Sequence, residues 1–221
     1  MRLRLKSRVS AMLNAVRHDL VMQRVLERLE RVGIFINPYV LFREGVRLPD
    51  KTDWPELAKE FPSSLLVAAD IPAVAACVSR TEAQIQDRLA KGHLCIVLKN
   101  GERIAGYAWA DLDEVNDMAC DYELRPGEAY LYDAFIAPAF RGRSLAPYMR
   151  AESYRHLQRA GRHTYYSISD YFNTPAIRFK RKLNAEAIRL YLQVKLGRHQ
   201  IGQWLLHDYE QRPTPHAPPG H

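Results

Sequence analysis

The chain lacks the features of a membrane-spanning, secreted or metal-binding protein. Its 221 residues contain no apolar run near the roughly 20 residues that cross a bilayer. The first residues do not form the apolar core of a signal peptide. Three cysteines, Cys77, Cys95 and Cys120, lie far apart, which favours buried thiols in a reducing compartment. Since the eight histidines show no metal-ligand spacing either, we expect a cytoplasmic protein without a metal site.

Two nucleotide-related classes also lack support. No G-x-G-x-x-G sequence follows a predicted strand, which excludes a Rossmann dinucleotide site. No motif of a known nucleic-acid reader accompanies the net charge of +7. Much of that charge lies in residues 1–31, where eight Lys and Arg face three acids. This excess is explained by a solvated basic helix face or by attraction to an anionic surface.

Apolar residues between Val9 and Val32 recur with a helical period. They predict an amphipathic helix over about 8–32 that ends at Gly33. Its apolar stripe favours docking on its own domain or on a second copy in a homodimer, with peripheral membrane contact as the alternative. Residues 34–62 are punctuated by prolines and are expected to be irregular. We therefore expect an N-terminal extension over 1–60, a folded domain over 61–210 and a disordered tail over 211–221.

The most informative stretch is a strand, a tight turn and a helix. Tyr130 to Ile136 is dense in aromatic and apolar residues and predicts a buried strand, which Pro138 ends. From Leu145 the apolar positions take a helical period. Free N–H groups and the helix dipole at such a helix start favour a phosphate. Arg141 and Arg143 lie in the turn beside it.

The turn resembles the acyl-CoA-binding signature of the GCN5-related N-acetyltransferases, V-x-P-x-x-R-G-x-G-x-G/A. The matching positions are Pro138, Arg141, Gly142 and Ala146. Ser144 departs, because the family usually has a second glycine there. Since serine carries a Cβ, we expect the loop to hold it without a positive φ. The resemblance implies that coenzyme A contacts Phe135, Ile136, Ala137, Arg141, Gly142, Arg143, Ser144, Leu145 and Ala146.

A second stretch resembles the family signature N-x-x-A-x-x-L-Y-x-K-L-G-F. Its matching residues are Asn173, Ala176, Phe179, Lys182 and Leu183. The resemblance implies that Asn173 binds the pantetheine arm and that its helix, with Phe179, lies along coenzyme A; Asn173 is equally a good N-cap. Lys180 stands where the family often has a tyrosine that protonates the leaving thiolate. Tyr171 is therefore the substitute candidate for the general acid, by proximity. Asn184 and Ala185 replace the usual Gly-Phe.

The remaining periodicities complete an element order. Strands are expected at 64–68, 93–98, 104–110, 163–169, 185–194 and 203–209, and further helices at 70–79, 81–92 and 173–183, with an acidic loop over 111–121. Asn100-Gly101 marks a hairpin and Thr81 with Gln84 a capping box. This order is similar to that of the acyl-CoA N-acyltransferase (GNAT) fold, an α/β (α+β) fold with a mixed central sheet flanked by helices.

Two carboxylates on the central strand are candidates for the base that deprotonates an amine. Glu128 lies ten residues before Pro138, near the position of the catalytic glutamate in histone-type members of the family. Asp133 lies closer to the strand bulge that the resemblance implies. Five positions apart, they face opposite sides of a regular strand, unless a bulge lies between them. The choice between them stays open.

The resemblance also implies an oxyanion donor, supplied by the bulged backbone at about Phe135 to Ala137. Tyr130 and Tyr132 share the side of Glu128, and Trp109 lies on the preceding strand. These three aromatic residues are expected to shape the acceptor pocket, although a core position explains Trp109 equally well.

The predicted activity is direct transfer of an acetyl group from acetyl-CoA to a primary amine of a small molecule or amino sugar. A longer acyl donor is one alternative. A non-catalytic acyl-CoA sensor is the other, and the departures at Ser144 and Lys180 favour it mildly.

Overall fold

The computed structural model describes residues 24–26, 28–45, 54–77, 80–117 and 120–210. Its elements, in chain order, are β1 (Ile34–Glu44), α2 (Pro55–Glu60), β2 (Ser63–Leu65), α3 (Ile71–Cys77), α4 (Glu82–Ala90), β3 (Leu94–Asn100), β4 (Arg103–Asp111), β5 (Glu114–Asp117), β6 (Cys120–Glu123), β7 (Glu128–Ile136), α5 (Leu145–Arg159), β8 (Thr164–Asp170), α6 (Thr174–Lys182), β9 (Glu186–Leu196) and β10 (His199–Asp208).

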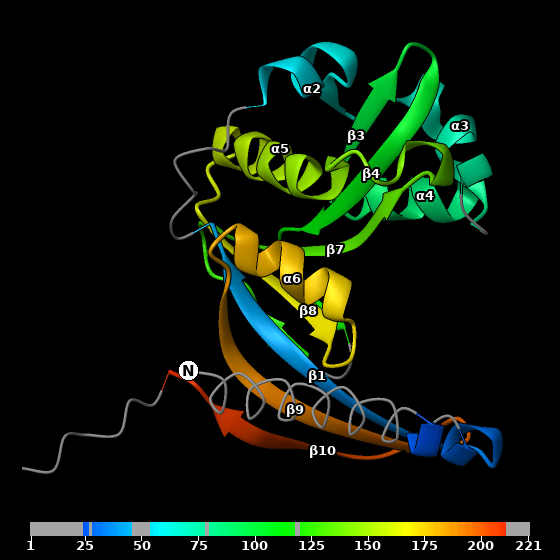
Figure 1. Ribbon diagram of the computed structural model, residues 1–221, viewed down its shortest axis with the longest axis vertical. Helices are drawn as coiled ribbons and strands as arrows, with labels where there is room; N and C mark the ends of the chain where they lie inside the picture. The colour runs from blue at the N-terminus through cyan, green and yellow to red at the C-terminus, as the bar shows by residue number, and fades with distance from the viewer. Residues whose placement is uncertain (1–23, 27, 46–53, 78–79, 118–119, 211–221) are drawn as a thin grey trace, which may run out of the picture.

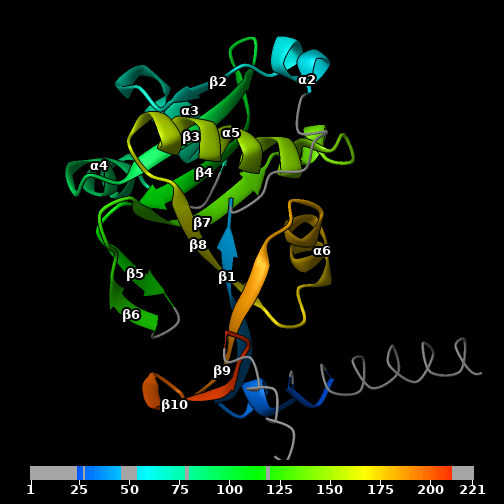
Figure 2. The same ribbon diagram turned by 90° about the vertical axis from the view of Figure 1, so that its left-hand side faces the viewer.

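One eight-stranded sheet organises the molecule, in the order β10-β9-β1-β8-β7-β4-β3-β2. Its strands pair antiparallel, except that β7 and β8 run parallel. Helices α5 and α6 cover one face, and α3 and α4 cover the other face of the β3–β4–β7 half (Figure 1; Figure 2). The sheet is therefore mixed and flanked by helices, as the sequence predicts.

The expectation of an irregular segment over 34–62 is wrong. Strand β1 occupies Ile34–Glu44 and lies inside the sheet, paired with β8 on one side and β9 on the other. Helix α2 follows at Pro55–Glu60. A boundary at residue 60 would thus separate β1 from the sheet in which it lies.

Pro38 is the reason that β1 escapes a sequence-based prediction, since proline normally stays out of central strands. Its partner on β9 is Leu192, whereas the register with β8 begins one residue later, at Tyr39. The Pro38 carbonyl accepts the N–H of Tyr171, just past the end of β8. The proline nitrogen, which has no hydrogen to donate, therefore faces the position just beyond the end of β8. The pairing of β1 with β8 begins at Tyr39, so it loses no hydrogen bond to Pro38.

The acidic segment after β4 is also more regular than expected. The Asp111 carboxylate accepts the N–H groups of Asp113 and Glu114 and turns the chain. The hairpin of β5 and β6 follows, where the sequence predicts a loop. This hairpin lies beside the α4 end of the sheet (Figure 2).

Other local predictions are confirmed. Thr81 and Gln84 form the expected capping box at the start of α4. Residues 24–26 and 28–31 are helical and precede Gly33, which has a φ of +83°. The rest of the expected N-terminal helix and the tail over 211–221 lie outside the described residues.

Strands β7 and β8 diverge soon after they begin. They pair from Glu128 opposite Thr164 to Tyr130 opposite Tyr166. Beyond that point β7 continues along β4, while β8 continues along β1. Among the strands of the described residues, none therefore pairs with the β8-facing side of β7 after Tyr130. The separation is visible below β7 in Figure 1.

A bulge lies in the diverging part of β7. Tyr132 pairs with Trp109 and Phe135 with Tyr107, so β7 holds one extra residue between these pairs. Asp133 has a φ of +47°, in the left-handed region. The bulge thus lies at Asp133 and Ala134, upstream of the expected Phe135 to Ala137.

Candidate functional site

The loop between β7 and α5 is held open by two left-handed residues. Gly142 has a φ of +78° and Ser144 a φ of +58°. The expectation that Ser144 avoids positive φ is therefore wrong. Left-handed backbone costs an L-residue about 1–2 kcal/mol, so the loop keeps this conformation against an intrinsic preference.

This conformation leaves a row of amides without partners. The N–H groups of Phe140 and Arg141 donate to the carbonyls of Ala137 and Pro138. In the described part of the chain, the N–H groups of residues 142–146 have no hydrogen-bond acceptor. Such donors at the start of a 15-residue helix, together with its dipole, favour an anion.

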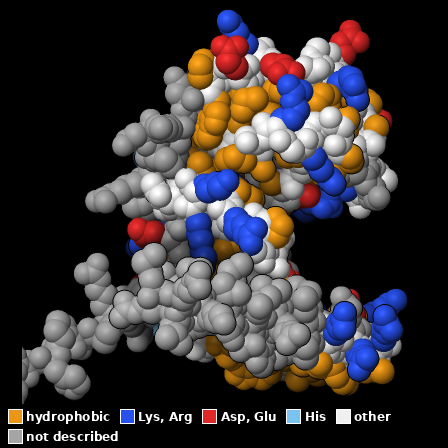
Figure 3. Space-filling model, in the orientation of Figure 1, with side chains coloured by type: hydrophobic (Ala, Val, Ile, Leu, Met, Phe, Trp, Pro, Cys, Tyr) orange, Lys and Arg blue, Asp and Glu red, His pale blue; other side chains and the backbone are white. Residues whose placement is uncertain are grey.

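The two arginines of the loop have different partners. Arg141 donates from Nε to the Ile136 carbonyl at 3.1 Å, and its terminal nitrogens make no further hydrogen bond with the described residues. Arg143 forms an ion pair with Glu60 of α2 at 2.6 Å and lies over the Phe61 ring. Arg143 therefore ties the loop to α2. Figure 3 shows further Lys and Arg side chains at the level of α6, on the face that carries α5 and α6.

One strand N–H also faces the opening between β7 and β8. The N–H of Ala137 donates to the Ala105 carbonyl at 2.9 Å. Because amides alternate in direction along an antiparallel strand, the N–H of Ile136 points away from β4, toward the diverging β8. Of the expected donors, Ala137 is therefore occupied, and Phe135 faces β4 as well.

Asn173 caps helix α6. Its side-chain oxygen accepts the N–H of Ala176 at 3.2 Å, so the capping interpretation is confirmed. Phe179 packs against the core cluster of Tyr154, Tyr165 and Leu183. Whether Asn173 and Phe179 also contact coenzyme A stays a prediction.

Lys180 points into the protein and is 2% exposed. Its Nζ donates to the Ile168 carbonyl at 3.1 Å and lies 3.7 Å from the Glu44 carboxylate. Burial lowers the pKa of Lys180 to about 7, although Glu44 raises it and Arg150 lowers it further.

Glu44, at the end of β1, is the centre of this buried polar cluster and escaped sequence analysis. It is fully buried and accepts the hydroxyl groups of Tyr154 and Ser167, with Arg150 Nε at 3.4 Å. Burial raises the pKa of the Glu44 carboxyl, but Arg150, Lys180 and the two hydroxyl groups outweigh it and lower the pKa overall. The cluster joins β1, α5, β8 and α6 beneath the diverging strands.

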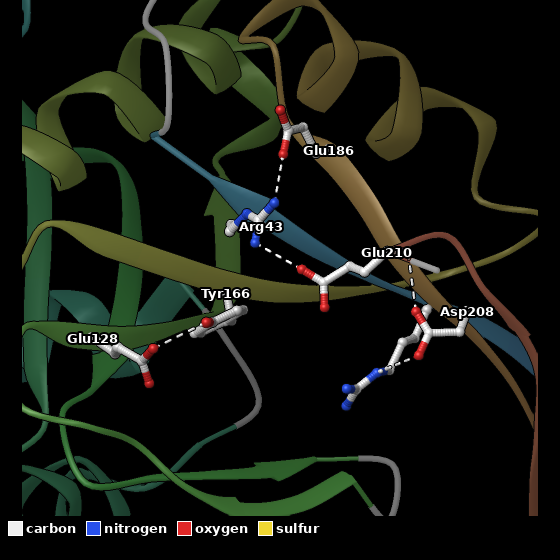
Figure 4. Close-up of polar contacts among 7 residues, drawn as sticks. Arg43, Glu128, Tyr166, Glu186, Asp208 and Glu210 are labelled. Atoms are coloured by element: carbon white, nitrogen blue, oxygen red, sulfur yellow. Dashed lines mark hydrogen bonds and ion pairs between the residues drawn. The ribbon is translucent and has the colours of Figure 1, made fainter. Parts of the chain in front are cut away.

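Glu128 lies at the closed end of the β7–β8 divergence. Its Oε1 accepts the Tyr166 hydroxyl at 3.0 Å (Figure 4), and its Oε2 accepts the N–H of Arg125. Eight residues of strand, about 25 Å at 3.3 Å per residue, separate its backbone from that of Ile136. These contacts suit a structural carboxylate at the start of the strand.

Asp133 is engaged by two guanidinium groups. Its Oδ2 lies 2.7 Å from Arg88 and 2.9 Å from Arg80. The bulge directs this side chain to the α4 face. Oδ2 of Asp133 is thus held by two ion pairs, and the role of Glu128 or Asp133 as the base stays a prediction.

A polar cavity of about 600 Å³ lies between α4, the β5 end of the hairpin and β7. Tyr130, Tyr132 and Asp133 line it, as do His93 and Asp111. Basic and acidic side chains from the segment before α4, from α4 and its C-cap, and from β5 complete the wall: Arg80, Asp87, Arg88, Lys91 and Glu114. The tyrosines expected in an acceptor pocket are thus brought together here, beside the bulge.

Trp109 lies beneath this cavity. It is 1% exposed in the core cluster under α3 and α4, and the Arg88 guanidinium lies 5.1 Å above its ring. Trp109 is therefore a core residue that supports Arg88. Tyr171 is 46% exposed and packs its ring against Phe172. Its expected role as general acid stays a prediction.

Within the described residues, no group of three or more His, Cys, Asp or Glu side chains is placed to hold a metal ion. No helix in that part of the chain is long and apolar enough to cross a membrane.

Comparison with protein-family models identifies the acetyltransferase (GNAT) family over residues 54–185, which is more than half of the chain. This protein belongs to the GNAT acetyltransferase family. The matched region runs from before α2 to the residue before β9, so β1, β9 and β10 lie outside it. No curated protein matches the chain.

Solved structures agree with this GNAT fold. An acetyltransferase of the GNAT family from Novosphingobium aromaticivorans superposes with a TM-score of 0.53 at 18% identity, over 74% of this chain and 66% of that one. A GCN5-related N-acetyltransferase from Sphaerobacter thermophilus gives 0.53 at 15% identity, over 82% and 56%. The chain thus spans between about half and two thirds of these proteins, and identities this low show the fold alone.

In this GNAT protein the loop over 141–146 and helix α6 coincide with the two stretches that resemble the family signatures. The divergence of β7 from β8 lies between them in space, because α5 follows one strand and α6 follows the other. Strand β7 connects the three features: Tyr130, Tyr132 and Asp133 line the polar cavity, the strand continues as the unpaired edge, and the loop with the free amides follows it.

Proposed function

We propose that this GNAT protein transfers an acetyl group from acetyl-CoA directly to a primary amine of a small polar molecule, such as an amino sugar. The observation that carries the proposal is the row of unpartnered amides over 142–146, at the start of α5 and next to the unpaired edge of β7. Amides in this arrangement suit the diphosphate of coenzyme A.

The residues present fit acetyl-CoA as co-substrate. The loop amides and Arg141 are donors for the diphosphate, and the exposed side of β7 is free to receive an extended arm through main-chain hydrogen bonds. When bound, acetyl-CoA supplies a thioester carbonyl carbon as the electrophile. The N–H of Ile136 and the bulge at Asp133 and Ala134 would then stabilise charge on the thioester oxygen.

The polar cavity is the proposed acceptor site. Tyr132 lines it directly before the bulge, so an amine held there lies near the proposed oxyanion donors. Asp87, Asp111 and Glu114 on its wall favour an ammonium group, and Arg80, Arg88 and Lys91 favour polar or anionic substituents. A small polar amine therefore suits the lining. Holding amine and thioester together would supply much of the rate.

Thermal unfolding with acetyl-CoA, followed by a thiol-release assay over a panel of amines, tests the proposal. At 100 times its Kd, acetyl-CoA should stabilise the protein by about 2.7 kcal/mol, which raises Tm by about 5–10 °C. At least one small polar amine should then release free coenzyme A.

The other outcomes separate the alternatives. Stabilisation without release on any amine would favour an acyl-CoA sensor, and faster release from a long-chain acyl-CoA would favour a long-chain N-acyltransferase. The absence of any stabilisation would remove all three functions.

A further inference from the structure

Three polar side chains, two from strands β4 and β7 and one from the residue before β3, form a line in the wall of the cavity. His93, directly before β3, places Nδ1 2.6 Å from the Tyr132 hydroxyl of β7. Its other nitrogen, Nε2, lies 3.4 Å from Oδ2 of Asp111 at the end of β4. These contacts join Asp111, His93 and Tyr132 in sequence, and Tyr132 stands directly before the bulge.

The groups on either side of the His93 ring indicate which of its two nitrogens carries the proton. Asp111 is nearly buried and its other oxygen already accepts two backbone N–H groups, so it acts as an acceptor. We assign the ring proton of the neutral imidazole to Nε2, the nitrogen on the side of the Asp111 carboxylate, and this assignment leaves Nδ1 as the acceptor. The Tyr132 hydroxyl therefore donates to His93, and its oxygen lone pairs are available toward the cavity.

The surroundings of Tyr132 oppose a lasting negative charge on its oxygen. Burial raises the pKa of the Tyr132 hydroxyl well above its ordinary value, although the Arg88 guanidinium, 5.0 Å from the ring centre, acts in the opposite direction. A hydroxyl in this position can receive one proton while it gives up another. It does not serve as a stored phenolate.

The expected bases are engaged elsewhere. Glu128 binds Tyr166 and the backbone at the closed end of the strands, and Asp133 binds two arginines. In the described cavity wall, the Tyr132 hydroxyl beside the bulge contacts His93, and His93 contacts Asp111. A proton that arises at the bulge can therefore reach a histidine through Tyr132.

We propose that this line is the proton acceptor for amine acylation, an inference that rests on the proposed function. As the amine nitrogen bonds to the thioester carbonyl carbon, its N–H proton passes to the Tyr132 oxygen. The Tyr132 hydroxyl proton passes to His93 Nδ1, and Asp111 stabilises the resulting imidazolium. The coenzyme A thiolate leaves with the C–S electron pair and takes a proton from solvent, and His93 releases the proton it received back to solvent, which restores the relay.

The first test is the pH profile of kcat/KM in three variants. Tyr132→Phe and His93→Gln should lower kcat about 100-fold, the lower end of general-base effects, without changing the Kd for acetyl-CoA. Asp111→Asn should also lower kcat, because a neutral amide stabilises the imidazolium of the proposed step less than the carboxylate does. His199→Gln on β10 and Tyr209→Phe, both exposed, are the matched controls and should leave rate and profile unchanged.

Other charged groups face the same cavity and also contribute to the profile: Arg80, Asp87, Arg88, Lys91, Glu114 and Asp133. The proposal is therefore overturned if His93→Gln retains both the wild-type rate and the wild-type acid limb. A loss of acetyl-CoA binding in these variants would equally contradict it, since none of the three residues lies in the loop over 141–146.

A second measurement does not depend on turnover. In ¹⁵N-histidine NMR at a pH where His93 is neutral, the signal that disappears in His93→Gln should show the proton on Nε2. A proton on Nδ1 would refute the relay. Unchanged acetyl-CoA stabilisation with that result would leave the proposed function standing, whereas loss of stabilisation in the wild type would reject the function itself.

Discussion

Replacing Glu44 with glutamine should destabilise the protein strongly. Glu44 is the only acid in the described buried cluster, where it faces Arg150 and Lys180 and accepts two hydroxyl groups. Glutamine keeps the shape and removes the charge. Arg150 is 5% exposed, and one of its terminal nitrogens, Nη1, already lacks a hydrogen-bond partner. The substitution therefore leaves a buried guanidinium without its counter-charge.

The magnitude follows from that uncompensated charge. Removing one partner of a buried ion pair costs about 3–5 kcal/mol. Lys180 limits the cost because its pKa is lowered to about 7, so it can lose its proton, whereas Arg150 cannot. For a domain of this size each kcal/mol moves Tm by about 2–4 °C. We expect Glu44→Gln to lower Tm by about 10 °C.

Differential scanning calorimetry and urea unfolding at pH 8 measure the effect. The matched control is Glu186→Gln on β9, whose ion pair with Arg43 is half-exposed (Figure 4) and should be worth less than about 1 kcal/mol. If Glu44→Gln and Glu186→Gln lose the same stability within about 1 kcal/mol, the buried cluster does not hold β1 in the sheet as described.

Three further predictions concern the loop and the cluster. Arg141→Glu should weaken acetyl-CoA binding about 10- to 100-fold in calorimetric titration, because it replaces a charge-assisted donor with a negative charge. The control Arg198→Glu, in the exposed β9–β10 turn, should leave the Kd unchanged. Equal Kd values for Arg141→Glu and the wild type would count against the assigned loop. Gly142→Ala should lower the free energy of unfolding by about 1–2 kcal/mol in urea, because alanine disfavours the φ of +78° at this position. No atom lies within 4 Å of the added Cβ, so a steric clash does not contribute. An unchanged free energy of unfolding would mean that this φ is not required. In the wild type the free energy of unfolding should rise by about 2–3 kcal/mol between pH 7 and 9, because the pKa of Lys180 is about 7 in the folded state and 10.5 in the unfolded state, so that mainly the unfolded state binds the proton in this window. Lys180→Met should abolish this rise. Parallel pH dependence of the two proteins would contradict the lowered pKa.

Local patterns carried most of the prediction of the fold. The strand, turn and helix around Gly142 form because each step has a local cause: an apolar strand, a proline that ends it and a glycine that turns it. The capping box at Thr81 is local in the same way. Helix α6 likewise begins at its Asn173 cap.

The errors arise where distant residues decide. Strand β1 is stabilised by pairing with β8 and β9, more than 120 residues away, and Pro38 hides its strand pattern. Ser144 takes a left-handed φ that its side chain disfavours, because the loop before α5 requires it.

The candidate site shows the same division. Tyr130 and Tyr132 were found from the strand that bears them. His93 and Asp111 were missed because only the pairing of β3, β4 and β7 brings them to Tyr132. No spacing in the sequence signals that contact, nor does any spacing signal that Asp133 binds two arginines.

The most direct test is an amide NMR titration of the intact protein with acetyl-CoA. If the row of backbone donors grips the diphosphate and β7 receives the acyl arm, the largest shifts should fall at 142–146 and 133–136. Shifts confined to other regions, such as β9 and β10, or no change at millimolar acetyl-CoA, would contradict the assignment of this loop as the coenzyme site.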